Sequence, residues 1–450
     1  MSSLQKGLLR AIPINIKGYL QPFIYGLVGG LSAVGFQLAI KFLEGLLWTR
    51  LSTIATGSFV LISIVTILGT SLAAGLILTY VSRDAAGSGV PQLKIAFWRD
   101  FGYLPFKVVF AKFFAGVITI GGGCSLGREG PTVHIAGALA SNIAGMLGVA
   151  KQGRRPALLS GAAAGLAAAF NTPLSAITFV MEEIVEDLNN TRFLAQTLVA
   201  AVTATFVAHL FFGEDPAFVI PSVRHFSWIL VFLVPPTAAL AALAGVAFQK
   251  GTLVWRDRIK NIGGVPLYLK PVIGAGINWV LGIIVFLWIA RLGVFGLGYQ
   301  DLEAVLRGQV NGFHVLILLV AKLAATTAVY AWGGAGGIFS PTLFFGATTG
   351  FLFGAICTPI SSFAKRPVGP DCRRDERLSR LRCSCADHVD SDRFRDDSPV
   401  RFRPAADDRN NREPSGQPPL LFDELLQRGD RARRDRTRTA HPSALLFIVA

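Results

Sequence analysis

The chain has 450 residues, of which 52% are hydrophobic and 16% are charged, and its formal net charge is +15. Average soluble domains carry about 25% charged residues, so this composition disfavours a large soluble protein. A strongly basic balance is also typical of nucleic-acid-binding proteins, but here the basic residues lie in short loops and toward the C-terminal end of the sequence. Basic loops set membrane orientation and contact anionic lipid, so we expect no nucleic-acid partner.

Apolar runs of about 20 residues, the length that crosses a bilayer, follow one another along the chain. In chain order they are Gln21–Leu47, Thr56–Tyr80, Arg155–Val180, Phe193–Phe212, Trp228–Phe248, Pro271–Ala290 and Phe313–Ala331. They predict an all-α, polytopic membrane protein, with residues 1–18 as an N-terminal segment before the first span. We expect it to lie in the inner or plasma membrane of the cell.

Glycine, with 48 residues, is abundant inside these apolar regions. Three stretches look like breaks in helices: Gly121–Gly123, Gly127–Pro131 and Gly333–Pro341. Irregular backbone at membrane depth is tolerated where it packs in protein or lines a cavity. A helix N-terminus there offers free N–H groups and a partial positive charge of about half a unit, which can replace the water that an anion loses. The breaks therefore predict anion binding within the membrane.

The first motif is Gly87-Ser88-Gly89-Val90-Pro91. The serine supplies a hydroxyl donor, the flanking glycines leave the backbone bare, and proline is favoured in the first turn of a helix. Taken alone, the motif also fits an ordinary loop.

The second motif, Gly127-Arg128-Glu129-Gly130-Pro131, has a guanidinium and a carboxylate between apolar runs. Ionisable residues inside a membrane are costly and usually functional. The alternative is a local Arg128–Glu129 pair in a loop. Adjacent residues face each other poorly, so such a pair explains the two charges badly.

Two further motifs follow along the chain. Phe170-Asn171-Thr172-Pro173-Leu174 leads into an apolar helix that ends at Glu182 and Glu183, which would also fit a helix emerging into water. Gly336-Gly337-Ile338-Phe339-Ser340-Pro341 repeats the pattern of glycines before a proline-started helix. A glycine hinge in a transporter helix would explain this last motif equally well.

The four motifs, in this order and at these distances, resemble the CLC family of chloride channels and proton/chloride antiporters. The family patterns are GSGIP, G(K/R)EGP and GGIFxP, with a paired acid after an N-x-P-L helix, and the match covers about Gly18 to Gly354. The resemblance implies two inverted-topology repeats of broken, tilted helices, usually assembled as a homodimer. Residues 19–212 would form the first half and residues 213–362 an incomplete second half.

The same resemblance assigns residues to chloride binding. They are Ser88, Gly89, Arg128, Gly130, Ile338 and Phe339. The Ser88 hydroxyl corresponds to a ligand of the central anion, and the backbone amides of Ile338 and Phe339 correspond to its other donors. By the same analogy, serine at this position favours chloride over nitrate.

The resemblance makes Glu129 the gating glutamate, whose carboxylate occupies an anion position and swings out when it is protonated. A carboxylate competes with chloride for the same N–H groups, and protonation removes the charge that holds it there. Glu183 then corresponds to the internal glutamate that passes protons between the cytoplasm and Glu129. Its presence favours proton-coupled chloride antiport, with a gated passive chloride channel as the alternative.

A membrane-embedded enzyme that uses Glu129 or the Glu182–Glu183 pair is the rival from another class. No His/Asp metal set or nucleophile–base pair accompanies these acids, and the five cysteines have neither a disulfide framework nor a metal-binding spacing. We therefore expect a transporter without cofactor or metal, not an enzyme. We expect His134 to pack or hydrogen-bond, and Lys112 to snorkel or to pair structurally.

From about Phe363 the sequence becomes dense in Arg, Asp and Pro, and residues 363–450 do not continue the membrane pattern. The resemblance requires a further helix there and a tyrosine that coordinates the anion. With suitably chosen ordinary codons for Pro370 to Asn410, a reading one base out of frame can give an apolar segment with such a tyrosine. We therefore interpret the tail as frameshifted or disordered, and an inactive product is a further alternative.

We predict a one-nucleotide insertion or deletion in the gene between the codons for Phe363 and Asn411. Restoring the frame is expected to replace the charged stretch by apolar membrane sequence. Sequencing this region beside the genes of close relatives tests the idea, and an alignment without such an indel would end it.

Overall fold

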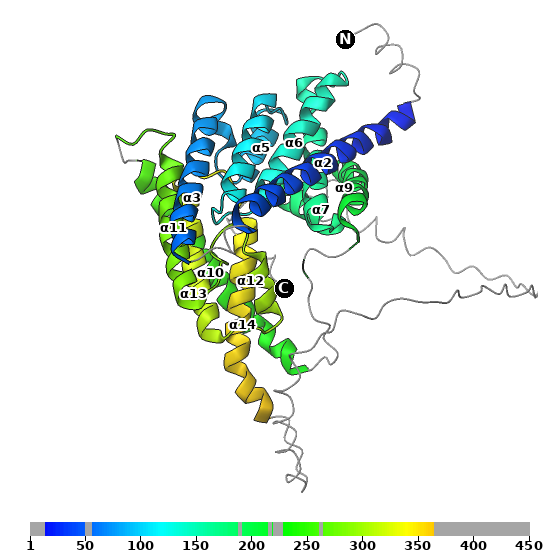
Figure 1. Ribbon diagram of the computed structural model, residues 1–450. Helices are drawn as coiled ribbons and strands as arrows, with labels where there is room; N and C mark the ends of the chain where they lie inside the picture. The colour runs from blue at the N-terminus through cyan, green and yellow to red at the C-terminus, as the bar shows by residue number, and fades with distance from the viewer. Residues whose placement is uncertain are drawn as a thin grey trace, which may run out of the picture. The chain divides into compact units, whose positions relative to one another are not determined.

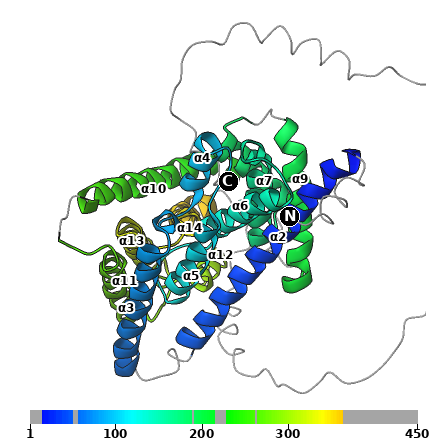
Figure 2. The same ribbon diagram turned by 90° about the horizontal axis from the view of Figure 1, so that it is seen from above.

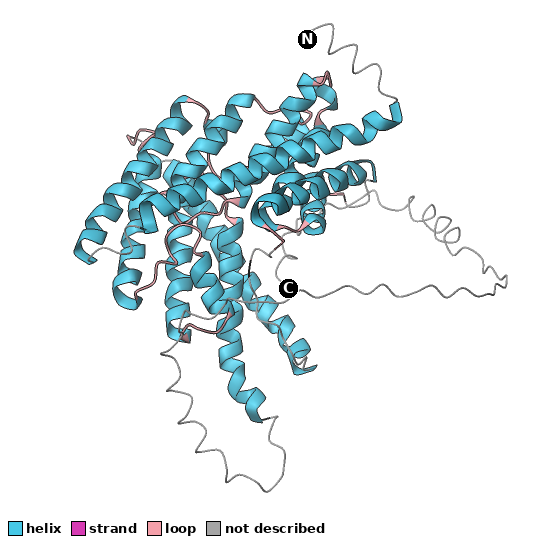
Figure 3. Cartoon of the chain, turned by 45° about the vertical axis from the view of Figure 1, so that its right-hand side comes forward, coloured by secondary structure: helices cyan, strands magenta, loops and turns pink. Residues whose placement is uncertain are grey.

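The computed structural model describes residues 14–49, 56–187, 191–214, 218, 228–260 and 264–363. Within these ranges the chain folds into helices joined by loops, and no strand is assigned (Figure 3). Most of the predicted N-terminal segment 1–18 and of the charged tail 363–450 lies outside the described residues.

The helices of the first half begin with α2 and end with α9. They are α2 (Ile14–Glu44), α3 (Thr56–Tyr80), α4 (Val90–Arg99), α5 (Phe106–Gly121), α6 (Glu129–Met146), α7 (Arg155–Phe170), α8 (Pro173–Val180) and α9 (Thr191–Phe212). Short elements between them are η1 (Gly45–Thr49), η2 (Arg83–Ala85), η3 (Lys151–Gly153) and η4 (Met181–Val185). The second half has α10 (Trp228–Lys260), α11 (Lys270–Ile289), α12 (Tyr299–Leu306), α13 (Gly312–Ala331) and α14 (Phe339–Phe363).

Among the described residues, seven helical segments are long and apolar enough to cross a membrane. They are Leu20–Trp48, Gly57–Tyr80, Phe193–Phe212, Val231–Ile259, Lys270–Ile289, Gly312–Ala331 and Phe339–Cys357. Every predicted run overlaps one of these segments except Arg155–Val180, and the last segment was not among the predicted runs.

The prediction that Arg155–Val180 forms one continuous spanning run is wrong, because this segment is not a single helix. α7 ends at Phe170, Asn171 adopts a left-handed conformation with φ of 60°, and α8 begins at Pro173. Proline lacks the N–H that would continue the preceding helix, and asparagine tolerates the left-handed region. The apolar run is therefore two short helices with a break between them.

α7 is the centre on which other helices of the first half pack. Every residue from Ala157 to Ala169 is buried, and α2, α6 and α9 all contact this helix (Figures 1 and 2). A Cβ added at Gly161 would lie 2.4 Å from the carbonyl oxygen of Ala136 on α6. Small residues thus let the backbones approach closely, as in other membrane helix bundles.

The two halves of the chain also pack against each other, through α3 and α11. α11 contacts α13, and α3 contacts α5 (Figure 1). The indole Nε1 of Trp279 on α11 donates a hydrogen bond of 3.0 Å to the hydroxyl of Ser63 on α3. The second-half helices are therefore tied to the first half.

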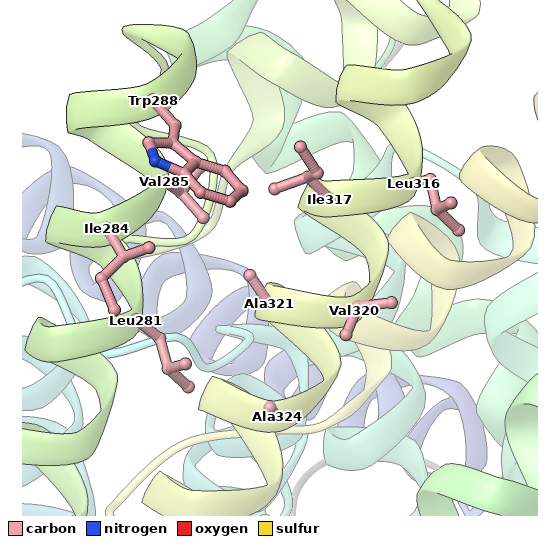
Figure 4. A pocket seen from close by; sticks show the side chains of 9 residues that line it. All are labelled: Leu281, Ile284, Val285, Trp288, Leu316, Ile317, Val320, Ala321 and Ala324. Atoms are coloured by element: carbon pink, nitrogen blue, oxygen red, sulfur yellow. The ribbon is translucent and has the colours of Figure 1, made fainter.

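A cavity of about 330 Å³ lies between α11 and α13. Figure 4 shows its lining, which consists of Leu281, Ile284, Val285, Trp288, Leu316, Ile317, Val320, Ala321 and Ala324. None of these side chains is charged and most are aliphatic. The cavity is therefore not a candidate ion site.

α9 carries a stripe of apolar side chains that are exposed in the single chain. Its members recur every fourth residue and are Leu194, Leu198, Val202, Phe206 and Leu210. Residues four apart lie on one face of a helix, so the stripe is a continuous apolar surface.

Candidate functional site

The segments that precede α6 and α14 are joined by a pair of backbone hydrogen bonds. The N–H of Gly127 donates to the carbonyl of Gly337 at 2.7 Å, and the N–H of Gly337 donates to the carbonyl of Gly127 at 2.6 Å. This antiparallel bridge unites the GREGP and GGIFSP motifs. The N-terminal ends of α6 and α14 consequently lie beside each other.

The GSGVP motif meets the same place. A Cβ added at Gly130 would lie 2.5 Å from the Ser88 hydroxyl oxygen and 3.1 Å from the Cα of Gly337. Ser88 is 6% exposed, and α4 begins directly after Gly89, whose φ is 101°. Three of the four motifs thus converge around Gly130, at the N-terminal ends of α4, α6 and α14.

Glu129 is the first residue of α6 and is 1% exposed. Its Oε1 accepts a hydrogen bond of 2.5 Å from the hydroxyl of Tyr299, with which α12 begins. Its Oε2 accepts a hydrogen bond from the hydroxyl of Ser340, near the start of α14. The carboxylate therefore connects the first half of the chain to two helix N-termini of the second half.

Arg128 lies beside this carboxylate without forming a close ion pair. Its Nε is 3.8 Å from the Oε1 of Glu129, longer than a hydrogen bond, and has no hydrogen-bond partner in the described part of the chain. Its guanidinium carbon lies 5.3 Å from the centre of the Tyr299 ring. A local Arg128–Glu129 pair therefore does not account for the carboxylate, whose hydrogen bonds go to hydroxyls.

A buried lysine holds the loop that carries Ser88. The Nζ of Lys112 on α5 donates to the carbonyl of Ala85 at 3.0 Å and to the carbonyl of Gly87. The prediction that Lys112 has a structural pairing role is confirmed by these bonds. His134 on α6 packs closely against Gly89, and its ring nitrogens have no hydrogen-bond partner among the described residues.

The second half has a matching lysine. The Nζ of Lys322 on α13 donates to the carbonyls of Gly293 at 2.8 Å and Gly296 at 3.1 Å. These carbonyls belong to the loop that ends at Gly298, whose φ is 70°, directly before α12. Each half thus positions a glycine loop and a following helix N-terminus with one buried lysine.

The motif that begins at Phe170 and leads into α8 lies against the start of α14. The Phe339 ring is centred 5.4 Å from the ring of Phe170 and 5.9 Å from the ring of Phe179 on α8. These aromatic contacts join the N-terminal end of α14 to the break between α7 and α8. The N-x-P-L helix therefore belongs to the same assembly of residues.

Glu183 lies on the π-helical turn η4 that follows α8, and it is half-buried. Side chains of α4 bind this turn and the residue that follows it. Lys94 pairs with Glu186 at 2.5 Å, and the Nε1 of Trp98 donates to the carbonyl of Ile184 at 3.0 Å. Since α4 begins beside Ser88, one short helix links the meeting point of the motifs to the turn that carries Glu183.

Sequence reasoning missed Tyr299 and gave Ser340 no role, although it quoted the motif that contains Ser340. A signal for Tyr299 exists. The run Gly296-Leu297-Gly298-Tyr299 has a glycine on each side of one residue directly before a helix, as Gly87-Ser88-Gly89 has before Val90. Comparing the two loops would have placed Tyr299, like Val90, at the start of a helix beside the site, although the residue that matches Ser88 is Leu297.

The donors around the carboxylate are mainly neutral. They are hydroxyl groups and helix N-termini, where the first N–H groups have no partner inside the helix. Within the described ranges, no group of three or more His, Cys, Asp or Glu side chains could hold a metal ion. This chemistry suits an anion or a carboxylate.

The profile of the family described as "Voltage gated chloride channel" matches residues 69–369. The "H(+)/Cl(-) exchange transporter ClcA" of Vibrio parahaemolyticus serotype O3:K6 is 30% identical over 339 residues, which are 74% of this chain and 71% of the relative. The chain belongs to the CLC family. A ClcA of Vibrio campbellii is 29% identical to this CLC protein over 350 residues, 76% of this chain and 74% of the relative.

Solved CLC structures share the fold. The crystal structure of a slow cyanobacterial Cl−/H+ antiporter matches with a TM-score of 0.65 and 21% identity, over 77% of this chain and 81% of that chain. A CLC-type fluoride/proton antiporter matches with a TM-score of 0.63 and 18% identity, over 77% and 82%. With this fold and seven candidate spans among its described residues, the protein is a multi-pass membrane protein.

The replacement Lys112→Met is expected to lower the melting temperature by several degrees. It removes the donor to two loop carbonyls, and a buried polar group without a partner costs about 1–3 kcal/mol. Lys107→Met changes an exposed lysine on the same helix and should have little effect. Thermal unfolding of the purified variants in detergent measures the difference. Equal melting temperatures for Lys112→Met and Lys107→Met would contradict the proposal that Lys112 stabilises the loop.

Proposed function

We propose that this CLC protein exchanges chloride for protons across a membrane, with Glu129 as the gate and Glu183 as the inner proton acceptor. The observation that carries the proposal is the meeting of the buried Glu129 carboxylate with the N-terminal ends of α6 and α14, beside Ser88. The names of the Vibrio relatives, both H(+)/Cl(-) exchange transporters, support the same pair of ions.

The proposed chloride site uses partial charges. The Ser88 hydroxyl and the amides of Ile338 and Phe339 would donate to the ion, where the start of α14 adds the positive end of a helix dipole. Gly89 and Gly130 have no side chains, so neighbouring groups can approach the backbone closely. A Cβ at Gly130, for example, would lie 2.5 Å from the Ser88 hydroxyl oxygen. Neutral donors bind a dehydrated ion without trapping it, as conduction requires. Arg128 adds a nearby full positive charge.

The gate follows from competition between two anions. In its ionised form the Glu129 carboxylate takes hydrogen bonds that a halide could otherwise receive. Protonation removes its charge, so its hold on these donors weakens. The side chain can then leave, and chloride can take the position. Proton uptake and anion movement are coupled because they use the same donors.

Glu183 suits the inner end of the proton path. It lies outside the seven apolar spans, on a turn where burial raises the pKa of its carboxyl group. Lys94 acts against this rise, whereas Glu186 and Glu182 add to it. A carboxyl group with a raised pKa takes up and releases protons closer to neutral pH. Glu182 beside it is exposed and has no assigned role.

A gated passive chloride channel is the second candidate within the family. The half-buried acid at position 183 favours exchange, because passive conduction needs no inner proton acceptor. The reversal potential of the reconstituted protein in a pH gradient separates the two candidates: exchange shifts it with pH, and passive conduction does not. The homodimer implied by the resemblance stays a prediction.

Glu129→Gln is expected to give chloride flux that no longer depends on pH, because glutamine cannot ionise. Chloride efflux from vesicles containing the full chain, measured over a range of pH, checks this. Glu214→Gln, at an exposed acid, is the control. If Glu129→Gln has the same chloride flux and pH response as the parent protein, Glu129 is not the gate.

Glu183→Gln is expected to retain chloride flux and to lose proton coupling, because the inner carboxyl group can no longer take up a proton. Proton uptake into vesicles driven by a chloride gradient measures the coupling. Glu303→Gln, in a surface pair with Arg307 at 3.6 Å, should remain coupled. Unchanged coupling in Glu183→Gln would rule out the proposed acceptor.

A further inference from the structure

Two hydroxyl groups hold both oxygens of the Glu129 carboxylate. Tyr299 donates to Oε1 at 2.5 Å, and Ser340 donates to Oε2. The two hydroxyl oxygens are themselves 2.9 Å apart. Glu129 and Ser340 are each 1% exposed, so water does not compete freely for these hydrogen bonds.

We propose that Tyr299 and Ser340 form a hydroxyl latch, which holds the ionised Glu129 carboxylate in the closed position and sets the pH at which anion flux begins. The latch rests on the proposed gating role of Glu129 and adds a regulatory element to it. Both residues act through Glu129 and are positioning residues.

The Tyr299 ring is fixed from two sides, which directs its hydroxyl at the carboxylate. The Arg128 guanidinium lies 5.3 Å from the ring centre, and the Phe218 ring makes an edge contact at 4.9 Å. The backbone before Tyr299 is fixed as well, because Lys322 binds the carbonyl of Gly296. A donor that is already in position loses little conformational entropy when it binds.

Ser340 is equally constrained. It lies in the first turn of α14, directly after the segment that Gly337 ties to Gly127. Its hydroxyl therefore reaches Glu129 from a rigid helix end. The latch consists of one donor from each of two separate second-half helices.

Counting hydrogen atoms shows how the latch can release. Two hydroxyl hydrogens serve three close oxygen–oxygen contacts. While Glu129 is ionised, both hydrogens point to the carboxylate. When the carboxyl group leaves, one hydroxyl can donate to the other across 2.9 Å, and the second hydrogen remains available to an incoming anion. Opening therefore leaves no hydroxyl without a possible partner.

The sign of the pH effect follows from charge. Hydrogen bonds to an ionised carboxylate are stronger than those to a neutral carboxyl group, so the latch favours the ionised, closed gate. Removing one hydroxyl favours the protonated, open gate. Anion flux should then begin at a higher pH.

Other charged groups near the carboxylate stay the same in the test variants. Arg128 lies at the start of the same helix, with Nε 3.8 Å from Oε1. Glu44 at the end of α2 interacts electrostatically with Arg128, Lys41 and Lys322. A change in pH response after Tyr299→Phe or Ser340→Ala therefore reports on the lost hydroxyl.

The test is the pH profile of chloride efflux from vesicles that contain the full chain. Tyr299→Phe and Ser340→Ala should each move the midpoint of acid activation upward by about one pH unit, the size expected for one hydrogen bond to a charged group. In a Glu129→Gln background neither change should alter the profile. Unmoved or lowered midpoints in both single variants would overturn the latch.

Tyr25→Phe is the matched control. Tyr25 is also buried, in a cluster with Ala140, Ala144 and Ala157. Ala140 is 11 residues along α6 from Glu129, or about 16 Å at 1.5 Å per residue. This variant should keep the parental midpoint, and an equal shift would mean that loss of any buried tyrosine hydroxyl disturbs transport.

A second measurement separates failure of the latch from failure of the proposed function. If the parent protein shows no chloride flux, the exchange proposal fails and the latch is tested by thermal unfolding. Melting temperatures of Tyr299→Phe, Glu129→Ala and the double variant form a cycle. Non-additive changes support the hydrogen-bonded cluster, and additive changes overturn it.

Discussion

Two backbone hydrogen bonds between Gly127 and Gly337 are the contact on which the rest of the site depends. They join segments about 210 residues apart, and each segment leads into a helix whose free N–H groups face the centre. Ionised side chains are costly in a membrane, and a fixed cation in direct contact would hold an anion more firmly than conduction allows. Broken helices solve both problems, because a helix N-terminus offers donors and a partial charge without an ionised group. The glycines are required since a side chain at Gly337 would meet the backbone nitrogen of Gly130 at 2.9 Å.

The two halves reach this point by the same construction. A helix with a buried lysine, α5 or α13, precedes a break and then a helix that starts at the centre. The lysine reaches back to carbonyls of a glycine loop, which leads into a short helix, α4 or α12. The two short helices differ in what they bring: α4 follows the small Ser88, whereas α12 starts with the large Tyr299. Ser88 lies between the two glycines of its loop, whereas Tyr299 follows the second glycine, so the two repeats place different positions of matching loops beside the site.

Much of this arrangement could be predicted from the sequence, but the contact between Tyr299 and Glu129 could not. The apolar runs and glycine breaks predicted the helical membrane fold, because length and hydropathy are local properties. The motifs predicted that Ser88, Glu129 and Phe339 lie close together, through resemblance to a family. Tyr299 escaped because its contact with Glu129 spans 170 residues and depends on how two repeats meet. Hydropathy did not reveal the break at Asn171, because the sequence is alanine-rich before it and apolar after it; only the motif with Pro173 indicated a new helix there.

The position of Phe339 has a consequence for the proposed exchange of chloride and protons. Its ring lies against Phe170 and against Phe179 on α8, and α8 runs directly into the turn that carries Glu183. Close-packed rings cannot move independently, because protein interiors have little free volume. If chloride binds at the start of α14 as proposed, any displacement of this helix end is passed to the element that leads to Glu183. The packed rings would then couple the proposed chloride site to the proposed proton acceptor Glu183.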